Sequence, residues 1–480
     1  MILEIVNHEY QYEAEKLTRL FYPNEKIKVV FGSAESVDEL RLRTSLTPEE
    51  VRAELFDKDG KCLFSEQSEY KNGDDRELLL MTLVFGILSR HTGYVPEWGM
   101  LTGIRPSKLF RSLGGRAREE FLGTYLVSEK KTALTENVAR AEEKIISLSK
   151  PESFSLYVSI PFCPSRCSYC SFVSHDMTAQ TVKKLMPDYI GALVKEISFT
   201  AETAKELGLN LESIYFGGGT PTTLDAEGLK TLTDAVSDSF DMGTVREYTV
   251  EAGRPDTVTA EKLRVLKNAG VSRISINPQS FSDRVLRAIG RKHTAAQTEE
   301  AFLLARKEGF GNINTDLIAG LPEDTEEGFR QTVEKTLSLN PENITVHSLA
   351  LKRASYMGED GVVQARKNRL CSRMLDFSYE KLTASGYTPY YMYRQSKTLG
   401  NLENTGYCKE GRECLYNIFM MEECHSVLAV GAGAVTRLKA PHGAQIDRIF
   451  NYKYPYEYIK DFDEILKRKK GIAEFYKNNP

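Results

Sequence analysis

The feature that most constrains the fold of this chain is a regular alternation between Ser155 and His347. Six short runs rich in β-branched residues recur there, namely SLYVSI, ESIYFGG, EYTVEA, SRISIN, NINTDLIA and NITVHS. Amphipathic segments such as AEGLKTLTDAVSDSF separate the runs and have the periodicity of helices. Strands that alternate with helices pair in parallel through right-handed crossovers. The alternation therefore predicts an α/β fold built on a partial (β/α)6 barrel of the TIM type.

Polar residues and glycines stand where each of these strands is expected to end. In the order of the six runs they are Cys163, Gly217–Thr220, Glu251, Asn277 with Gln279, Asp316 and His347. In (β/α) barrels the chemistry lies at the carboxyl ends of the strands. The sequence thus predicts that these residues share one site at the mouth of the barrel.

The alternation divides the chain into three expected parts. Residues 1–150 are predicted to form an N-terminal α+β accessory domain, 151–350 the barrel, and 351–480 a C-terminal α/β extension that covers the substrate. In the first part, VRAELFDKDGKCLFSE predicts a hairpin and ELLLMTLVFGILSRHTG a buried helix. LTGIRPSKLF predicts a turn that leads into a helix, and residues 362–385 predict a long helix in the third part.

Composition indicates an ordinary globular protein and argues against two kinds of partner. Of the 480 residues 41% are hydrophobic, and the formal net charge of −4 gives no basic field for nucleic acid. No apolar run reaches the roughly 18 residues of a membrane span. The first residues lack the basic and apolar regions of a signal peptide, so we expect a cytoplasmic protein. Its eight cysteines then lie in reducing surroundings, where disulfides are rare.

Three of the cysteines, Cys163, Cys167 and Cys170, lie close together in YVSIPFCPSRCSYCSF with the spacing Cys-x3-Cys-x2-Cys. Thiolates are the usual ligands of iron–sulfur clusters. Three of them on one loop can hold a [4Fe–4S] cluster and leave one iron open to bind a small molecule. A structural zinc is the first alternative, but it would need a fourth ligand such as His175. Unrelated buried cysteines are the second.

The cysteine motif also supports a resemblance to a known family. Its spacing and position after the first strand resemble the radical S-adenosylmethionine (SAM) superfamily. The segments YVSIPFC, GGGTP, NPQSF and DLIAGLP resemble the coproporphyrinogen oxidase-like branch of that superfamily, which comprises proteins of the HemN, HemW and HemZ types. The likeness to the HemZ type is the most extended, because it includes LTGIRPSK, ITVHSLALKRAS, MYRQ, LGNLEN and GAGAV. It covers roughly Leu101 to Leu438.

The resemblance implies a SAM pocket beside the cluster. Family residues that match Gln279 and Asp316 bind the ribose hydroxyls, and a Glu that matches Glu251 contacts SAM. Arg291, or the lysine that follows it, matches an arginine that binds the SAM carboxylate, and Tyr157 matches an aromatic residue near the cluster. Barrel packing for Tyr157 and a strand-end ion pair for Glu251 stay open as alternatives. The full set of implied SAM-binding residues is Tyr157, Gly218, Gly219, Thr220, Glu251, Gln279, Arg291 and Asp316.

The HemZ-type resemblance implies an oxidoreductase of porphyrin and haem biosynthesis. Its expected reaction is the oxygen-independent oxidative decarboxylation of coproporphyrinogen III to protoporphyrinogen IX, through a 5′-deoxyadenosyl radical. A flavodoxin- or ferredoxin-type protein is the expected reductant. A tetrapyrrole with four propionates calls for basic and aromatic contacts. The sequence offers Arg353, Arg394, Tyr390, Tyr391 and Tyr393 for them, although these can equally belong to an edge strand.

Two departures from the oxidase pattern keep other functions open. Phe172 stands where the established oxidases have another cysteine, as in the HemW-type haem chaperones, and Ser159 replaces the usual histidine. A haem-binding chaperone is therefore the main alternative. A different radical SAM reaction on a tetrapyrrole, such as methylation with ring opening, is another. A second cluster is a minor hypothesis, because the spacing of its cysteines matches no established pattern; they are Cys408, Cys414 and Cys424.

Overall fold

The structure, a computed structural model, divides the chain into two compact units. It describes the chain except residues 24, 34–37, 173, 351–360 and 396–397, and at 361–365 it describes the backbone alone. The first unit comprises Met1–Glu136, Ala350–Ser372 and Arg394–Glu403, and the second comprises Asn137–Leu349, Arg373–Tyr393 and Asn404–Pro480. These two units do not test the three parts expected from the sequence, so the boundaries of those parts stay a prediction.

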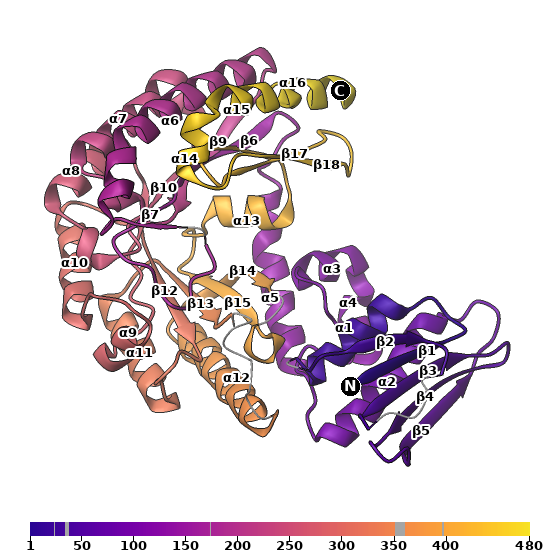
Figure 1. The fold of residues 1–480 in the computed structure, drawn as a ribbon. Coiled ribbons are helices and arrows are strands. Elements are labelled where there is room, and N and C mark those ends of the chain that lie inside the picture. The colour runs from indigo at the N-terminus through magenta and orange to yellow at the C-terminus, as the bar shows by residue number, and fades with distance from the viewer. Residues whose placement is uncertain (24, 34–37, 173, 351–360, 396–397) are drawn as a thin grey trace. The chain divides into compact units, whose positions relative to one another are not determined.

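The first unit is built on a five-stranded sheet in the order β2-β1-β3-β4-β5 (Figure 1). Its strand β1 pairs in parallel with β2 and β3, whereas β3, β4 and β5 pair antiparallel. Alternate residues of β4 are buried, as expected for a sheet with one face on a core. The strands are β1 (Ile2–Val6), β2 (Lys28–Phe31), β3 (Arg41–Leu46), β4 (Glu50–Phe56) and β5 (Cys62–Glu69).

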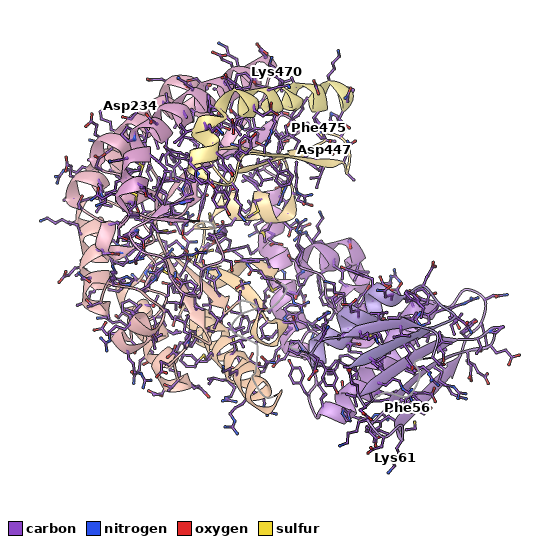
Figure 2. The ribbon with its side chains drawn as sticks, viewed as in Figure 1. Phe56, Lys61, Asp234, Asp447, Lys470 and Phe475 are labelled. Carbon is purple, nitrogen blue, oxygen red and sulfur yellow. The ribbon has the colours of Figure 1, made fainter. Side chains whose placement is uncertain are left out.

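The hairpin and both helices predicted in this part are confirmed. The hairpin is β4–β5, in which Phe56 ends the first strand and Lys61 directly precedes the second (Figure 2). The buried helix is α2, capped by the Asp75 side chain, which accepts from the backbone N–H of Leu78, and ended by Gly93 at a left-handed φ of 62°. The helices are α1 (Gln11–Phe21), α2 (Arg76–Thr92), α3 (Pro106–Leu113) and α4 (Ala117–Glu119).

The second unit contains the predicted barrel. The six strands follow one another in sequence order within a sheet ordered β14-β15-β13-β12-β11-β10-β9-β6-β16-β17-β18, and neighbouring members of the six are parallel. They are β6 (Ser153–Ile160), β9 (Asn210–Gly218), β10 (Glu247–Glu251), β11 (Arg273–Ser275), β12 (Ile313–Ala319) and β13 (Asn343–Ser348). This arrangement confirms the predicted partial (β/α)6 fold.

Helices cover the outer side of these strands (Figure 1). Nearly every residue of β6 is buried, because a parallel strand between helices and a filled interior has no solvent face. The crossover helices are α6 (Gln180–Glu206), α7 (Ala226–Ser239), α8 (Ala260–Asn268), α9 (Asp283–Ala288), α10 (Ala295–Lys307) and α11 (Glu326–Leu339).

The C-terminal extension adds strands at both edges of the barrel. β15 (Glu403–Cys408) pairs antiparallel with β13, and β16 (Ser426–Val430) pairs in parallel with β6. β16 thus adds a parallel strand next to the six that the alternation predicted. The remaining strands are β14 (Thr388–Arg394), β17 (Val435–Lys439) and β18 (Ile446–Phe450). The remaining helices are α5 (Glu129–Ile146), α12 (Gly361–Ala384), α13 (Leu415–Glu422), α14 (Pro455–Lys460), α15 (Phe462–Lys469) and α16 (Gly471–Asn478).

A buried ion pair closes the amino-terminal end of the barrel. Arg273 opens β11 and lies 3.1 Å from the carboxylate of Glu247, which opens β10. That carboxylate accepts from the first backbone N–H groups of α13, at Leu415 (3.1 Å) and Tyr416 (3.2 Å). Arg273 also donates to the carbonyl of Glu413 at 2.8 Å. The pair therefore holds the start of α13 against the strands, on the side away from the predicted site.

We predict that Arg273→Met destabilises the protein by about 3–5 kcal/mol, because Glu247 is left buried without its cation. Urea unfolding followed by circular dichroism measures the change. Arg264→Met is the matched control, since Arg264 pairs with Glu308 at the surface with 59% of its side chain exposed. We expect the control to change stability by less than about 0.5 kcal/mol. Equal effects of the two substitutions would show that the Arg273–Glu247 pair does not stabilise the amino-terminal end of the barrel.

Candidate functional site

The residues singled out at the strand ends do meet at one edge of the sheet. Ile160 at the end of β6 pairs with Gly218 at the end of β9, and Asp316 in β12 pairs with Thr345 in β13. Gln279, in the loop after β11, forms an isolated bridge with Leu317. Because all these strands are parallel, their carboxyl ends form one continuous edge, and the site is assembled there.

The cysteine loop starts at this edge and is held by backbone hydrogen bonds. Cys163 lies in the two-residue strand β7 (Phe162–Cys163), which pairs with β8 (His175–Asp176). The N–H of Ser168 donates to the carbonyl of Ile289, and that of Cys170 donates to Cys167. Cys167 is buried, whereas Cys163 and Cys170 are partly exposed. The loop is thus anchored to β8 and to the end of α9.

The environment of Cys163 bears on its predicted role as a ligand. In the described part of the chain, no three His, Cys, Asp or Glu side chains are grouped closely enough to hold a metal ion. The Thr220 hydroxyl lies 3.6 Å from Sγ of Cys163 and donates to it. Burial raises the pKa of the Cys163 thiol, and the hydrogen bonds from Ser174 and Thr220 lower it. The ligand set of Cys163, Cys167 and Cys170 stays a prediction, to which these donors add support.

The glycine loop packs directly on the start of the cysteine loop. A Cβ on Gly219 would lie 2.6 Å from the carbonyl oxygen of Phe162, which leaves no room for a side chain. Gly218 has a φ of +102°, and a Cβ there would lie 2.9 Å from the Ser159 hydroxyl. The N–H groups of Gly219 and Thr220 donate to the carbonyls of Ile160 and Phe162 at 2.9 and 2.7 Å. The glycines therefore bring two loops into contact, besides any contact with a ligand.

Glu251 ends β10 as a carboxylate with an unusual affinity for protons. Its Oε1 accepts from the Tyr215 hydroxyl at 2.6 Å. The pKa of Glu251 is raised to about 7 in total: burial and the nearby Asp316 raise it, whereas the Tyr215 hydrogen bond and His347 lower it. Near neutral pH this carboxyl therefore exists in both protonation states, a property that is common in functional sites.

Asp316 has the opposite electrostatic character although it is also partly buried. Burial alone would raise its pKa, but interactions with His347, Asn314 and Thr345 together lower it. The amide of Asn314 donates to Asp316 Oδ1 at 2.8 Å, and His347 Nε2 lies 3.9 Å from Oδ2. Asp316 is therefore an ionised acceptor at the mouth of the barrel, next to a carboxyl that titrates near neutral pH.

Gln279 combines backbone strain with an unsatisfied side chain. Its φ is +66°, a left-handed conformation that is uncommon for residues with a side chain. The backbone N–H donates to the carbonyl of Asp316, and the backbone carbonyl accepts from Ile318, so the conformation is held by β12. The buried side-chain oxygen Oε1 has no hydrogen-bond partner. A buried amide without a partner, held in a strained position, fits a polar ligand at this point.

Arg291 lies beneath the cysteine loop and is the buried member of the Arg291–Lys292 pair. Its Nη1 donates to the carbonyls of Asn277 (2.6 Å) and Gly253 (3.2 Å), and Nη2 donates to the Tyr169 hydroxyl (3.1 Å). The guanidinium thus joins two strand ends to the loop between Cys167 and Cys170, while its buried Nε has no partner. Its role toward a ligand stays a prediction.

Tyrosines fill the interior of the barrel below this edge. Tyr157 on β6 stacks on Tyr215 with ring centroids 6.2 Å apart and on Tyr416 at 6.1 Å. Tyr416 reaches the stack from α13 and lies 4.5 Å from the ring of Tyr215. Burial raises the pKa of Tyr157, as does the charge of Glu251. The packing alternative for Tyr157 therefore has direct support, and a contact with a cluster is compatible with it.

The residues proposed for a tetrapyrrole have different surroundings. Arg394 is buried and donates to the carbonyls of Leu101 and Asn401, and its guanidinium stacks over Trp98. Its donors are thus occupied within the first unit, where it anchors the LTGIRPSK segment. In the second unit, Tyr391 contacts the rings of both Tyr390 and Tyr393 on β14, which is an edge strand of the sheet, and the Tyr393 hydroxyl lies 3.4 Å from Nδ1 of His347. Arg353 lies outside the described residues.

The structure also reveals partners that the sequence reasoning missed. No sequence motif marks Tyr215 or Tyr416. Only the placement of β9 and α13 brings Tyr215 to Glu251 and Tyr416 to Tyr157. Arg254 was missed as well, although its position three residues after Glu251 in a strand-end loop was a usable signal. The hypothesis of a second cluster stays a minor prediction; of its cysteines Cys408 and Cys414 are buried and Cys424 is partly exposed.

Comparisons with known proteins agree with this geometry. A family model of the radical SAM superfamily matches residues 157–336. The chain is 36% identical over 475 residues to the oxygen-independent coproporphyrinogen-III oxidase-like protein HemZ of Bacillus subtilis, covering 95% of this chain and 94% of that protein. It is 33% identical to the heme chaperone HemW of Bacillus subtilis, covering 67% of this chain and 82% of HemW.

A crystal structure of the radical SAM enzyme HemN, the coproporphyrinogen III oxidase of Escherichia coli, has a similar fold. The TM-score is 0.52 at 23% identity, over 68% of this chain and 72% of HemN.

In the part of the chain that the structure describes, no helix is long and apolar enough to cross a membrane.

We predict that the carboxyl of Glu251 titrates near pH 7, and that Tyr215→Phe raises its pKa further because the hydrogen bond that stabilises the carboxylate is lost. Infrared difference spectra of the carboxyl stretch measure both values, with Glu251→Gln as the control that assigns the band. The folded protein then binds an extra proton between about pH 4.5 and 7, so the stability due to Glu251 is lost as the pH rises through 7. A midpoint near pH 4.5 would contradict this description of the site.

Proposed function

The chain belongs to the radical SAM superfamily, in the branch of HemN, HemW and HemZ, and from this membership we propose that it converts coproporphyrinogen III to protoporphyrinogen IX without oxygen. The observation that carries the proposal is the likeness to HemZ over 94% of that protein. The HemW proteins of Bacillus subtilis and Haemophilus influenzae match only 67% and 68% of this chain. The proposal includes a flavodoxin- or ferredoxin-type reductant and a cytoplasmic location.

Membership implies a [4Fe–4S] cluster and SAM as cofactors, and several residues of this chain suit them. Cys163, Cys167 and Cys170 would ligate three irons of the cluster. When bound, the cluster and SAM supply a 5′-deoxyadenosyl radical that abstracts a hydrogen atom from the substrate. The unpartnered Oε1 of Gln279 and the ionised Asp316 suit the two ribose hydroxyls.

The remaining residues of the pocket would orient SAM and keep water away. Gly218, Gly219 and Thr220 let the backbone approach the methionine end closely. Glu251 would pair with the SAM ammonium, which favours the ionised form of its carboxyl. Arg291 would bind the SAM carboxylate, if its guanidinium exchanges a backbone carbonyl for it. The tyrosine stack around Tyr157 fills the barrel below, so that side excludes water from the reaction.

The proposed reaction removes two propionate carboxyl groups. For each, a hydrogen atom leaves the β-carbon, the bond to the carboxylate breaks with loss of CO2, one electron passes to an acceptor, and a vinyl group remains. The substrate is anionic, so cations at the mouth suit it. Arg166 and Lys292 are exposed there. The charge of Lys292 and the backbone N–H of Arg166 both act on Asp176, which pairs with Cys163 between β7 and β8.

We predict that the reconstituted protein, incubated anaerobically with SAM, coproporphyrinogen III and a reductant, yields protoporphyrinogen IX together with 5′-deoxyadenosine. Mass spectrometry of both products measures the outcome. Cys167→Ala is the control that should lose both products, because its cluster lacks a ligand. Absence of both products from the wild-type protein carrying a full cluster would overturn the proposal. Formation of 5′-deoxyadenosine without protoporphyrinogen would indicate a different radical reaction on a tetrapyrrole.

A haem chaperone is the second candidate, and Phe172 is the observation that favours it. This residue stands where the established oxidases have a cysteine, and it is 69% exposed beside the cysteine loop. An exposed aromatic ring can stack on the face of a planar porphyrin, whereas it cannot serve as the metal ligand that a cysteine would be. Haem titration followed at the Soret band tests this candidate. Stoichiometric, saturable binding that Phe172→Ser weakens would support it, and lack of saturable binding would exclude it.

We predict that Gln279→Gly weakens SAM binding about tenfold, because one hydrogen bond to the ribose is lost while the left-handed backbone is kept without strain. Calorimetry on the cluster-loaded protein measures the dissociation constant. Gln331→Ala is the matched control, since Gln331 lies on α11 and its amide donates to the exposed Glu327. Unchanged affinity in Gln279→Gly would remove this residue from the SAM pocket.

A further inference from the structure

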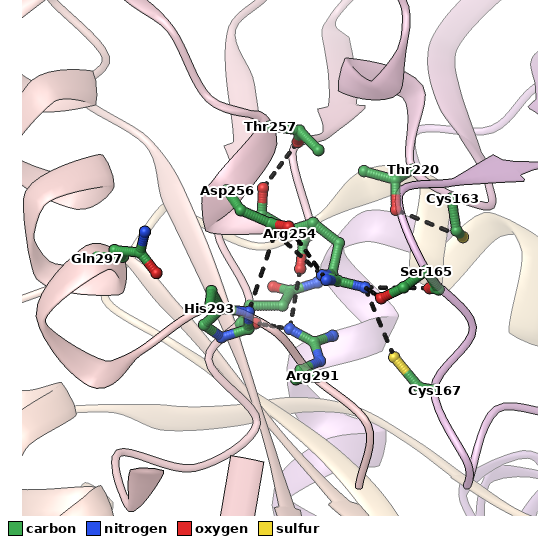
Figure 3. A network of polar contacts seen from close by, with 12 residues as sticks. Cys163, Ser165, Cys167, Thr220, Arg254, Asp256, Thr257, Arg291, His293 and Gln297 are labelled. Carbon is green, nitrogen blue, oxygen red and sulfur yellow. Dashed lines mark hydrogen bonds and ion pairs between the residues drawn. The ribbon is translucent and has the colours of Figure 1, made fainter. Parts of the chain in front are cut away.

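An arginine that the sequence reasoning did not assign reaches the cysteine loop from the neighbouring strand end. Arg254 follows β10 by three residues and is only 2% exposed. Burial of a guanidinium is costly unless its charge and its donors find partners. Figure 3 shows that the guanidinium of Arg254 lies between Asp256 on one side and Ser165 and Cys167 on the other.

One side of the guanidinium is held by a carboxylate. Nε and Nη2 of Arg254 donate to the two oxygens of Asp256 at 3.1 and 3.2 Å, a two-pronged ion pair. The Thr257 hydroxyl donates to the backbone carbonyl of Arg254 at 2.7 Å, and the Thr222 and Thr257 hydroxyls are 2.6 Å apart. These contacts leave the arginine little freedom, so the direction of its remaining nitrogen is set by the fold.

The remaining nitrogen, Nη1, points into the cysteine loop. It donates to the backbone carbonyl and to the hydroxyl of Ser165, both at 3.1 Å, and lies 4.0 Å from Sγ of Cys167. Ser165 and Cys167 are both buried. The loop therefore has a fixed cation and a hydrogen-bond donor at the sulfur of its middle cysteine.

A hydrogen-bond donor at a cluster sulfur changes the energy of the cluster's oxidation states. Reduction adds a negative charge, part of which resides on the sulfurs, and a nearby donor or cation stabilises that charge. Groups that contact metal ligands tune reduction potentials in this way. Because Arg254 is buried, water screens its charge less than it would at the surface.

We propose that Arg254 is a positioning residue for the cluster, which holds the Cys163–Cys170 loop through Ser165 and raises the reduction potential through Cys167. Asp256 orients the guanidinium and lies on its far side from the sulfur. This inference rests on the proposed function only for the presence of the cluster. A higher reduction potential would ease the transfer of an electron from a protein reductant to the cluster, whichever substrate reacts afterwards.

The test is a redox titration of the reconstituted protein, with the cluster followed by electron paramagnetic resonance. Arg254→Met should shift the midpoint potential to a more negative value, because the reduced cluster loses a cation and a donor. Arg254→Gln is neutral but keeps N–H donors, so its midpoint should lie between those of the wild type and Arg254→Met. Iron and sulfide per chain are measured for every variant, so that loss of cluster is separated from a change in potential.

Arg287→Met is the matched control. Arg287 is exposed on α9, whose following residue Ile289 accepts from the cysteine loop, so its removal takes a nearby charge away without touching a sulfur. Its midpoint should equal that of the wild type. Midpoints of Arg254→Met and Arg254→Gln equal to the wild type would overturn the inference. If Arg254→Met carries no cluster, the midpoint of Arg254→Gln alone tests the inference. A wild-type protein without a cluster would instead contradict the cofactor assignment itself.

Discussion

The contact on which the site depends is the close approach of Gly219 to Phe162. Parallel pairing of β6 and β9 brings Ile160 opposite Gly218, and the next residue must then pass the backbone of the cysteine loop. Two backbone hydrogen bonds form there, from Gly219 to Ile160 and from Thr220 to Phe162. A side chain at either glycine would separate the loops. The position of the first cysteine relative to the proposed SAM pocket therefore follows from strand register together with a lack of side chains.

The charged side chains at the mouth of the barrel are stabilised by hydrogen bonds and by groups of opposite charge. Asp316 is ionised among donors, whereas burial, helped by the charge of Asp316, raises the pKa of Glu251 to about 7. The cations Arg254 and Arg291 are held by carbonyls and one carboxylate; Arg254 lies 4.0 Å from Sγ of Cys167, and Arg291 donates to the Tyr169 hydroxyl. In the proposed function these cations would face the anionic cluster and the SAM carboxylate, and the acidic groups would face the ribose and the ammonium of SAM.

Local periodicity was enough to predict the six strands and the residues at their ends, because a parallel barrel places every strand end at one edge. Contacts between distant segments were not predictable in this way. Tyr416 and Glu247 meet through α13, which no pattern near β10 indicates, and β16 pairs with β6 although the two strands are far apart in the sequence. Arg394 shows a second limit of local patterns. A basic residue among tyrosines suggested a propionate contact, with a structural role in an edge strand as the alternative. In the structure its guanidinium donates to backbone carbonyls. Side-chain chemistry alone does not distinguish a buried structural cation from a binding one.

Ser159 shows how a departure from a family pattern can have a local cause. Its hydroxyl donates to the carbonyl of Ala432 at 2.8 Å, and its own carbonyl accepts from the Tyr189 hydroxyl, which in turn accepts from the N–H of Ala432. Gly431 would bring a Cβ within 2.5 Å of the Ser159 carbonyl oxygen, so the loop after β16 is packed tightly on this residue. A histidine would not fit the same hydrogen bond without moving that loop. The serine is therefore explained by packing between β6 and β16, and it carries no argument against the oxidase, whereas the exposed Phe172 does bear on the substrate.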